Sequence, residues 1–209
     1  MATANAIPIA DLRAGSRWWM PSLTDVFFFA VIFTLFLSDP AGWDRLAWDG
    51  DTGLHTSTGD YILDHGSVPT TDPFSFTRPG DRWFAFQWGA GVVFAALNRA
   101  AGLKGIVLLC GVLIAATFVI MLRNMLFRGA NGLVSMLLVL LAGNAMSIHF
   151  HARPHIFTLF FLAIAHYWIA RDLQRPSRAF WWIVPLTLLW ANMHSGFPVV
   201  LASLGLLAA

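Results

Sequence analysis

The chain contains no glutamate, one lysine and one cysteine among its 209 residues. Charged residues make up 11% of the chain, against about 25% in an average soluble domain. Hydrophobic residues make up 57%, and 18 Phe and 10 Trp are among them. A folded chain of this size still exposes about a third of its surface, so a soluble fold would leave much apolar surface in water. The composition therefore excludes a soluble enzyme, a disordered chain and a disulfide scaffold, and it indicates a polytopic α-helical membrane protein.

The few ionisable residues are unevenly distributed. The single cysteine, Cys110, lies inside an apolar run, where we expect it to be a small packing residue rather than a disulfide partner or a ligand in a CxxC site. Eight of the eleven acids lie between the first apolar run and Trp83, which marks this segment as a polar loop. These acids are Asp39, Asp44, Asp49, Asp51, Asp60, Asp64, Asp72 and Asp81.

Six apolar runs are candidates for transmembrane helices, which need about 20 residues. We expect these helices at about 21–38, 103–122, 132–148, 156–170, 180–191 and 197–209. The last run is still apolar at Ala209, so we expect the chain to be the amino-terminal part of a longer protein. The predicted fold is an all-α, polytopic membrane helix bundle of about six transmembrane helices. It forms a single domain with a long outer first loop that carries short interfacial helices.

The segment 84–97 decides the predicted topology, because it is apolar but only about 14 residues long. If it lies on the membrane surface, the basic clusters that include Arg13, Arg123 and Arg171 all face the cytoplasm, as the positive-inside rule requires. If it crosses the membrane, the last two clusters face outward. We therefore predict a cytoplasmic tail at 1–20, an outer loop at 39–102 and a transmembrane bundle at 103–209.

This topology places six of the seven histidines in three outer loops, together with most of the acids. Ionisable groups near a membrane are costly unless they face water, a partner or a substrate. We interpret the three loops as parts of one site, and simple solvated loops are the alternative. The six histidines are His55, His65, His149, His151, His155 and His194.

The first loop offers an acid and a histidine with helical spacing. Asp51 and His55 are four residues apart and would share one face of a helix. Asp72 precedes a proline and is either a turn residue or part of the site. A divalent metal held by Asp51, His55 and a second-loop histidine stays open, although the chain has no HExxH motif and no spaced Cys/His set.

The second loop has three histidines and Arg153 within seven residues, on the side where the charge rule disfavours cations. An arginine can bind a phosphate through two hydrogen bonds, and a histidine can donate to an anion, bind a metal or move a proton. In the third loop, Asn192 and His194 follow the end of a predicted helix, where ordinary capping is the alternative role.

Several motifs carry a family resemblance when taken together. They are D-x-G-x-H at 51–55, TGDYIL and HGSVPTTDPFSFTRPGDRW in the first loop, ARPHIF in the second and WANMHSGF in the third. With the order of spans and loops, they resemble the GT-C class of integral-membrane glycosyltransferases. That class includes the oligosaccharyltransferase catalytic subunit, the protein O-mannosyltransferases and the aminoarabinose transferase.

The resemblance implies inverting transfer of a sugar from a lipid-phosphate-linked donor to an acceptor on the outer face of the bacterial cytoplasmic membrane. It implies a lipid-linked donor and membrane lipids as partners, with no nucleic acid. By position, Asp51 would be the base or metal ligand, with Asp49 as the alternative and His55 beside it. Donor phosphate would bind Arg153, His149, His151 and His155, and substrate would bind Asp72, Asn192 and His194.

One departure from the class concerns the metal. Where the class commonly has an aspartate after the arginine, this chain has His155. This difference favours a metal-free mechanism, and the sequence requires no cofactor.

Two other functions stay open. A transporter would need ionisable residues within the spans or paired broken helices, and only Asn144 and His166 point that way. A noncatalytic membrane scaffold or assembly protein would tolerate replacement of the first-loop acids and histidines.

Overall fold

A computed structural model describes residues 22–36, 42–47 and 49–208 of the chain. Regular structure in this part is helical, apart from one isolated antiparallel bridge between Thr71 and Arg82, so the predicted all-α fold is confirmed. The predicted tail at 1–20 and Asp39 lie outside the described residues. The helices are α1 (Leu23–Phe36), α2 (Gly42–Ala47), α3 (Asp51–His65), α4 (Trp88–Ala101), α5 (Leu103–Phe127), α6 (Gly132–Met146), η2 (Ser147–His149), α7 (His155–Gln174), η3 (Arg178–Trp182), α8 (Ile183–Met193) and α9 (Pro198–Ala208).

Three helical segments are long and apolar enough to cross a membrane, namely α5, α6 continued by η2, and α7. They coincide with the predicted spans at 103–122, 132–148 and 156–170. Helices α1, α8 and α9 have only 14, 11 and 11 residues. At about 1.5 Å per residue, the described part of each of these three helices is shorter than a hydrocarbon core of about 30 Å. The described residues therefore support a membrane protein with three candidate spans, and the six-span arrangement stays a prediction.

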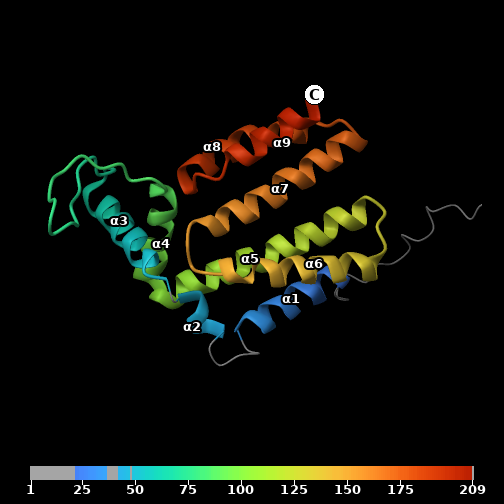
Figure 1. Cartoon of the computed structure of the whole chain (residues 1–209), viewed down its shortest axis with the longest axis horizontal. Coiled ribbons are helices and arrows are strands. Elements are labelled where there is room, and N and C mark those ends of the chain that lie inside the picture. The colour runs from blue at the N-terminus through green and yellow to red at the C-terminus, as the bar shows by residue number, and fades with distance from the viewer. Residues whose placement is uncertain (1–21, 37–41, 48, 209) are drawn as a thin grey trace, which may run out of the picture.

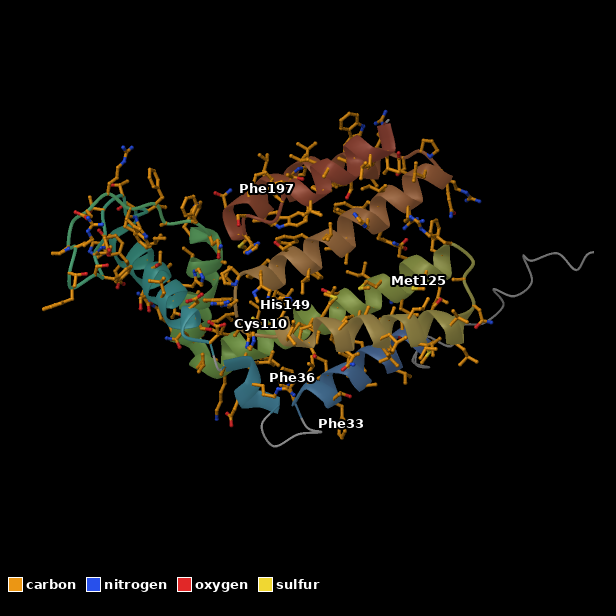
Figure 2. All side chains as sticks on the ribbon, in the orientation of Figure 1. Phe33, Phe36, Cys110, Met125, His149 and Phe197 are labelled. Atoms are coloured by element: carbon orange, nitrogen blue, oxygen red, sulfur yellow. The ribbon has the colours of Figure 1, made fainter. Side chains whose placement is uncertain are left out.

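Helix α5 is the central helix of the bundle (Figure 1). Helices α1, α4, α6 and α7 all pack against it, while α8 and α9 lie beyond α7. Cys110 of α5 is free and fully buried, as expected for a packing residue. Close by on α5, a Cβ on Gly111 would collide with the ring of Phe36, so the glycine allows α1 to approach (Figure 2). His166 lies 3.1 Å from the hydroxyl of Ser203 and links α7 to α9.

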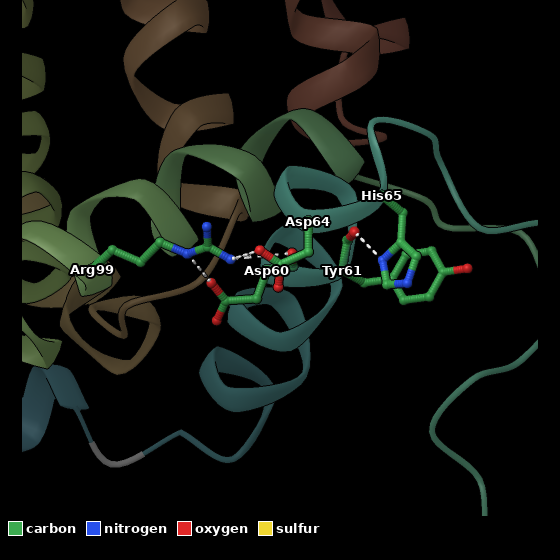
Figure 3. Close-up of polar contacts among 5 residues, drawn as sticks. All are labelled: Asp60, Tyr61, Asp64, His65 and Arg99. Carbon is green, nitrogen blue, oxygen red and sulfur yellow. Dashed lines mark hydrogen bonds and ion pairs between the residues drawn. The ribbon is translucent and has the colours of Figure 1, made fainter.

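Helices α3 and α4 form a tightly packed pair at one end of the bundle (Figure 1). A Cβ on Gly59 would collide with the carbonyl of Gly91, so the two backbones touch at this point. Further along the pair, Arg99 of α4 forms ion pairs of 2.7 Å with both Asp60 and Asp64 of α3 (Figure 3). The return segment at 66–87 joins α3 to α4, and its two limbs are paired at the Thr71–Arg82 bridge.

The beginning of α4 differs from the prediction. A helix was expected over 84–97, but α4 begins at Trp88. Gln87 has a φ of 67°, in the left-handed region, and this turn separates the preceding segment from the helix. The helix is also not an isolated surface element, because Ala90 and Phe94 are fully buried and the ring of Phe94 lies 6.2 Å from that of Phe157 on α7.

Candidate functional site

The predicted second outer loop, residues 149–155, is held in place by Ala152, which is fully buried. Its N–H donates to the carbonyl of Leu46 at 2.7 Å, and its carbonyl accepts from Oγ1 of Thr52 at 2.8 Å. Both backbone groups are thus paired with residues about a hundred positions away, which fixes the loop against α2 and α3. These hydrogen bonds place the side chain of the next residue, Arg153, beside the first turn of α3.

Arg153 contacts two carboxylates of the first loop. Its Nε lies 2.7 Å from Oδ2 of Asp49, and its Nη2 contacts Oδ2 of Asp51. The two acids are also connected, because the N–H of Asp51 donates to Oδ1 of Asp49 at 2.9 Å. The side chain of Asp49 is 11% exposed, whereas that of Asp51 is 55% exposed. Asp49 is therefore the enclosed partner of the guanidinium, and Asp51 is the carboxylate that a substrate can reach.

His55 lies on α3 one turn after Asp51, as its spacing predicts. Burial lowers the pKa of His55 from its ordinary value of 6.5, and this effect outweighs the Asp51 carboxylate, which raises it. The imidazole is therefore neutral at pH 7. In that form one ring nitrogen can accept a proton while the other donates a hydrogen bond.

Three further histidines form a row beside the acid–arginine cluster. The ring centroids of His149 and His155 are 6.2 Å apart, and those of His155 and His194 are 6.5 Å apart. Nε2 of His155 lies 2.5 Å from the carbonyl of His149. A carbonyl only accepts, so His155 carries a proton on Nε2. The row joins the predicted second and third outer loops through residues of η2, α7 and the end of α8.

A hydrogen-bond network fixes the tautomer of His194. The N–H of Gly196 donates to Nδ1 of His194 at 3.0 Å, so Nδ1 is an acceptor and the Thr158 hydroxyl, at 2.7 Å, also donates to it. Thr158 in turn accepts from Nε1 of Trp190 at 2.8 Å. Burial lowers the pKa of His194, and the neighbouring histidines add to this effect. Neutral His194 therefore carries its proton on Nε2.

Asp72 lies apart from this cluster and organises a turn. Its Oδ1 accepts from the N–H groups of Phe74 and Ser75 at 2.8 and 3.0 Å, and its Oδ2 accepts from the Ser75 hydroxyl. These hydrogen bonds, chiefly the one from the hydroxyl, lower the pKa of Asp72. Of the two roles that the sequence left open for Asp72, the geometry matches the turn.

Asn192 and His151 also have surroundings of their own. Nδ2 of Asn192 donates to the carbonyl of Leu188 within α8 at 2.8 Å. The Asn192 backbone packs against α4, where a Cβ on Gly89 would lie 3.0 Å from the Asn192 carbonyl. His151 lines a pocket of about 460 Å³ that α1, α5 and α6 also line.

A second pocket, of about 380 Å³, lies beside the third outer loop. Aromatic residues of the 66–87 return segment and the start of α4 line it, together with Ala191 and Ser195. The sequence alone gives these aromatics no place in the site, and only the fold places them beside the third loop. Gln87, at the turn between the return segment and α4, has a positive φ, and no sequence pattern indicates this conformation. The aromatic residues are Trp83, Phe84, Phe86 and Trp88.

No group of three His, Cys, Asp or Glu side chains is placed to hold a metal ion among the residues that the structure describes. The open metal hypothesis at Asp51, His55 and a second-loop histidine therefore finds no ligand set in this part of the chain. The arrangement instead combines a reachable carboxylate, a guanidinium and neutral imidazoles.

Six predicted site residues thus converge from three separate segments of the chain. They are Asp51, His55, His149, Arg153, His155 and His194. Asp49, the predicted alternative to Asp51, joins them as the second partner of the guanidinium. Comparisons of the chain with protein-family models, with curated proteins and with solved structures find no match.

Proposed function

We propose that the chain is a membrane glycosyltransferase of the GT-C type, which moves a sugar from a lipid-phosphate-linked donor to an acceptor hydroxyl with inversion. The observation that supports this proposal most is the convergence of two acids, one arginine and four histidines at the junction of two candidate spans, α6–η2 and α7. A transporter would place such groups within a span, whereas these lie at helix ends and in loops.

In this proposal Asp51 is the general base. Its carboxylate is the more exposed of the two acids, so an acceptor can reach it. It takes the proton of the acceptor hydroxyl while that oxygen attacks the anomeric carbon. The bond from this carbon to the phosphate oxygen breaks, and the lipid phosphate leaves with the electron pair. General base catalysis of this kind contributes about 10²–10⁴-fold to the rate.

Arg153 binds the phosphate of the donor in the same scheme. The guanidinium already has Asp49 and Asp51 as partners, and the three groups carry a net charge of −1 when both acids are ionised. Because this net charge repels a phosphate, the phosphate can bind Nη2 only when the Asp51 carboxylate gives up its contact there. Asp49 keeps its contact with Nε. The exchange frees the base at the moment when the donor is bound, and the guanidinium stabilises charge on the leaving phosphate.

The histidines supply hydrogen bonds without adding positive charge. His55 and His194 are neutral at pH 7, because burial lowers the pKa of both. Each can donate one N–H to a phosphate oxygen or a sugar hydroxyl, and His194 does so through Nε2. We assign Asp72 and Asn192 to the shape of the loops rather than to substrate contact.

The proposal includes an orientation in the membrane. We infer that the amino terminus is cytoplasmic and that the loop at 39–102 faces the outside of a bacterial cytoplasmic membrane. The distribution of arginines supports this orientation, because the loops after α5 and α7 then face inward with Arg128 and Arg175. Helices α1, α8 and α9 complete the six predicted spans.

The central test replaces the base. We expect Asp51→Asn to lower sugar transfer from a polyprenyl-phosphate sugar by about 10²–10⁴-fold, because the amide cannot accept the proton. Transfer is measured with a radiolabelled donor in membranes and with purified protein.

The matched control is Asp44→Asn, which changes an exposed acid on α2. This variant should transfer sugar at the rate of the unmodified protein, and both variants should insert and purify equally. Full activity of Asp51→Asn would remove Asp51 from the role. A noncatalytic scaffold would show no transfer by any variant and would tolerate both substitutions in a functional assay.

A further inference from the structure

The pocket between α1, α5 and α6 is apolar over most of its wall. Its volume of about 460 Å³ lies within the range of roughly 300–1,000 Å³ that is typical of ligand sites. Phe27 and Val31 of α1, Phe118 of α5 and Val139 of α6 line it. Because α5 and α6 are candidate spans, these walls lie among helices that contact lipid. Such surroundings favour a ligand with a long apolar part over a water-soluble ligand.

The other end of the pocket is polar and cationic. Arg45, Asn144, Ser147 and His151 lie there, and no carboxylate is among the described residues that line the pocket. One guanidinium and three side chains that can donate hydrogen bonds thus line this end without a carboxylate. The polar end therefore matches an anionic group with several oxygen atoms.

The polar end also adjoins the acid–arginine cluster. Arg45 precedes Asp49 by four residues, and His151 precedes Arg153 by two. The two segments are joined directly, because Ala152 donates to the carbonyl between them, that of residue 46, at 2.7 Å. A ligand whose anionic head occupies this end therefore lies beside the segment that carries Arg153, the residue assigned to the donor phosphate.

We propose that this pocket binds the lipid-phosphate carrier of the sugar donor, with the first part of its single isoprenoid chain between α1, α5 and α6. Its phosphate lies at the polar end, at Arg45 and His151. This inference rests on the proposed function. A single apolar compartment beside one cationic end suits a carrier with one chain and one phosphate group.

The first experiment fills the apolar end. Binding of polyprenyl phosphate without sugar is measured on the purified full chain in detergent by native mass spectrometry. Val31→Phe should weaken binding at least tenfold, because Val31 lines the pocket. The matched control is Val26→Phe on the same helix, at a 54% exposed position outside the pocket, and it should bind normally. Equal binding by both variants would overturn the inference.

The second experiment tests the polar end separately. Arg45→Gln and His151→Gln should each weaken binding of polyprenyl phosphate severalfold and leave binding of uncharged polyprenol unchanged. Arg78→Gln, at an exposed ion pair in the return segment, is the control and should bind both lipids normally. Loss of both lipids alike in the pocket variants would contradict a phosphate at this end.

Competition separates the carrier from ordinary membrane lipids. Phosphatidylglycerol in excess should not displace polyprenyl phosphate, and equal displacement would overturn the assignment to the carrier. The assignment of the pocket and the proposed glycosyltransferase activity can be contradicted independently. Normal lipid binding by Val31→Phe together with an inactive Asp51→Asn removes only the pocket. Impaired lipid binding by Val31→Phe with no sugar transfer by the unmodified protein removes only the proposed function.

Discussion

Asp49 and Asp51 are two residues apart, yet they have different surroundings. Asp49 is enclosed and holds Nε of Arg153, whereas Asp51 is half-exposed and contacts Nη2. From the sequence they are alternatives for one role. The structure gives each acid a separate relation to the same guanidinium, so their replacement should have separable kinetic consequences.

We expect Asp49→Asn to act mainly on donor binding. Loss of the enclosed charge removes one ion-pair partner of Arg153 and leaves it less firmly held, so KM for the lipid-linked donor should rise by about tenfold, which corresponds to about 1.4 kcal/mol. The value of kcat should change much less than in Asp51→Asn. Steady-state kinetics with varied donor measures both constants, and a fall in kcat with unchanged KM would assign the base role to Asp49 instead.

The two buried histidines predict how stability depends on pH. Burial lowers the pKa of His55 and His194 in the folded protein below the value of about 6.5 expected in the unfolded chain. The folded state then binds fewer protons than the unfolded chain. Burial of these two imidazoles therefore does not lower the free energy of unfolding above pH 6.5. That free energy decreases as pH falls through the folded pKa values. Thermal unfolding in detergent should therefore show Tm falling below pH 6.5.

His55→Gln and His194→Gln should each make this decline of Tm with acidification shallower. Between pH 7.5 and 8.5, the unmodified protein should show no contribution from these two groups. A Tm that rises as pH falls from 6.5 would contradict the buried neutral state.

The sequence predicts part of the site at this scale and not the rest. The four-residue spacing of Asp51 and His55 indicates a shared helix face, and ARPH indicates an unusual cationic loop. The partners that hold these residues come from distant positions, as with Thr52 and Ala152, which are one hundred residues apart. The bonds of Thr158 to His194 and Trp190 are equally invisible in a linear pattern, because they depend on how α7 meets α8.

At the scale of helices, the pairing of α3 with α4 depends on a contact between two glycines. A Cβ on Gly59 would meet the carbonyl of Gly91, which is backbone and cannot rotate away. Gly53 lies on the same helix, and a Cβ there would meet nothing within 4 Å. Alanine at Gly53 therefore changes helix propensity alone, whereas alanine at Gly59 also changes packing.

We expect Gly59→Ala to destabilise the protein by about 1–3 kcal/mol, as overpacking of a close contact does. Gly53→Ala should be neutral or stabilise by up to about 1 kcal/mol, because alanine is the better helix former. Reversible unfolding in detergent–denaturant mixtures measures both. A Gly59→Ala variant as stable as the unmodified protein would show that the helices separate without cost.

Helices were predictable where apolar length alone decides. The runs expected at 103–122, 132–148 and 156–170 correspond to α5, α6–η2 and α7 within a few residues at most boundaries. The start of α4 is not predictable from the sequence, because it follows a left-handed turn at Gln87, and glutamine carries no signal for that conformation. The expected helices at 180–191 and 197–209 are present as α8 and α9 but with short lengths.

At the scale of the whole molecule, the proposed chemistry requires that the first and second outer loops lie on one side of the membrane. The ion pairs of Arg153 join the two loops, and the described loop between α5 and α6 lies at the opposite end of the bundle (Figure 1). In the proposed orientation, the charge distribution puts the end that carries the α5–α6 loop in the cytoplasm.

Single-cysteine labelling checks this orientation. Because Cys110 is buried, we expect Thr77→Cys to react with a membrane-impermeant maleimide added to intact cells. Ala130→Cys, in the loop after α5, should react only after the membrane is opened. Both positions are exposed. Labelling of both from the same side of intact cells would contradict the orientation.

The return segment is closed across its own middle. Asp72 donates its N–H to the carbonyl of Asp81 at 2.8 Å, and Trp83 donates its N–H to the carbonyl of Thr70 at 3.0 Å. This clasp holds the two limbs of the segment together, and both limbs line the pocket beside Ala191. Shortening the exposed tip beyond the clasp would thus change the outer surface and leave the pocket wall in place.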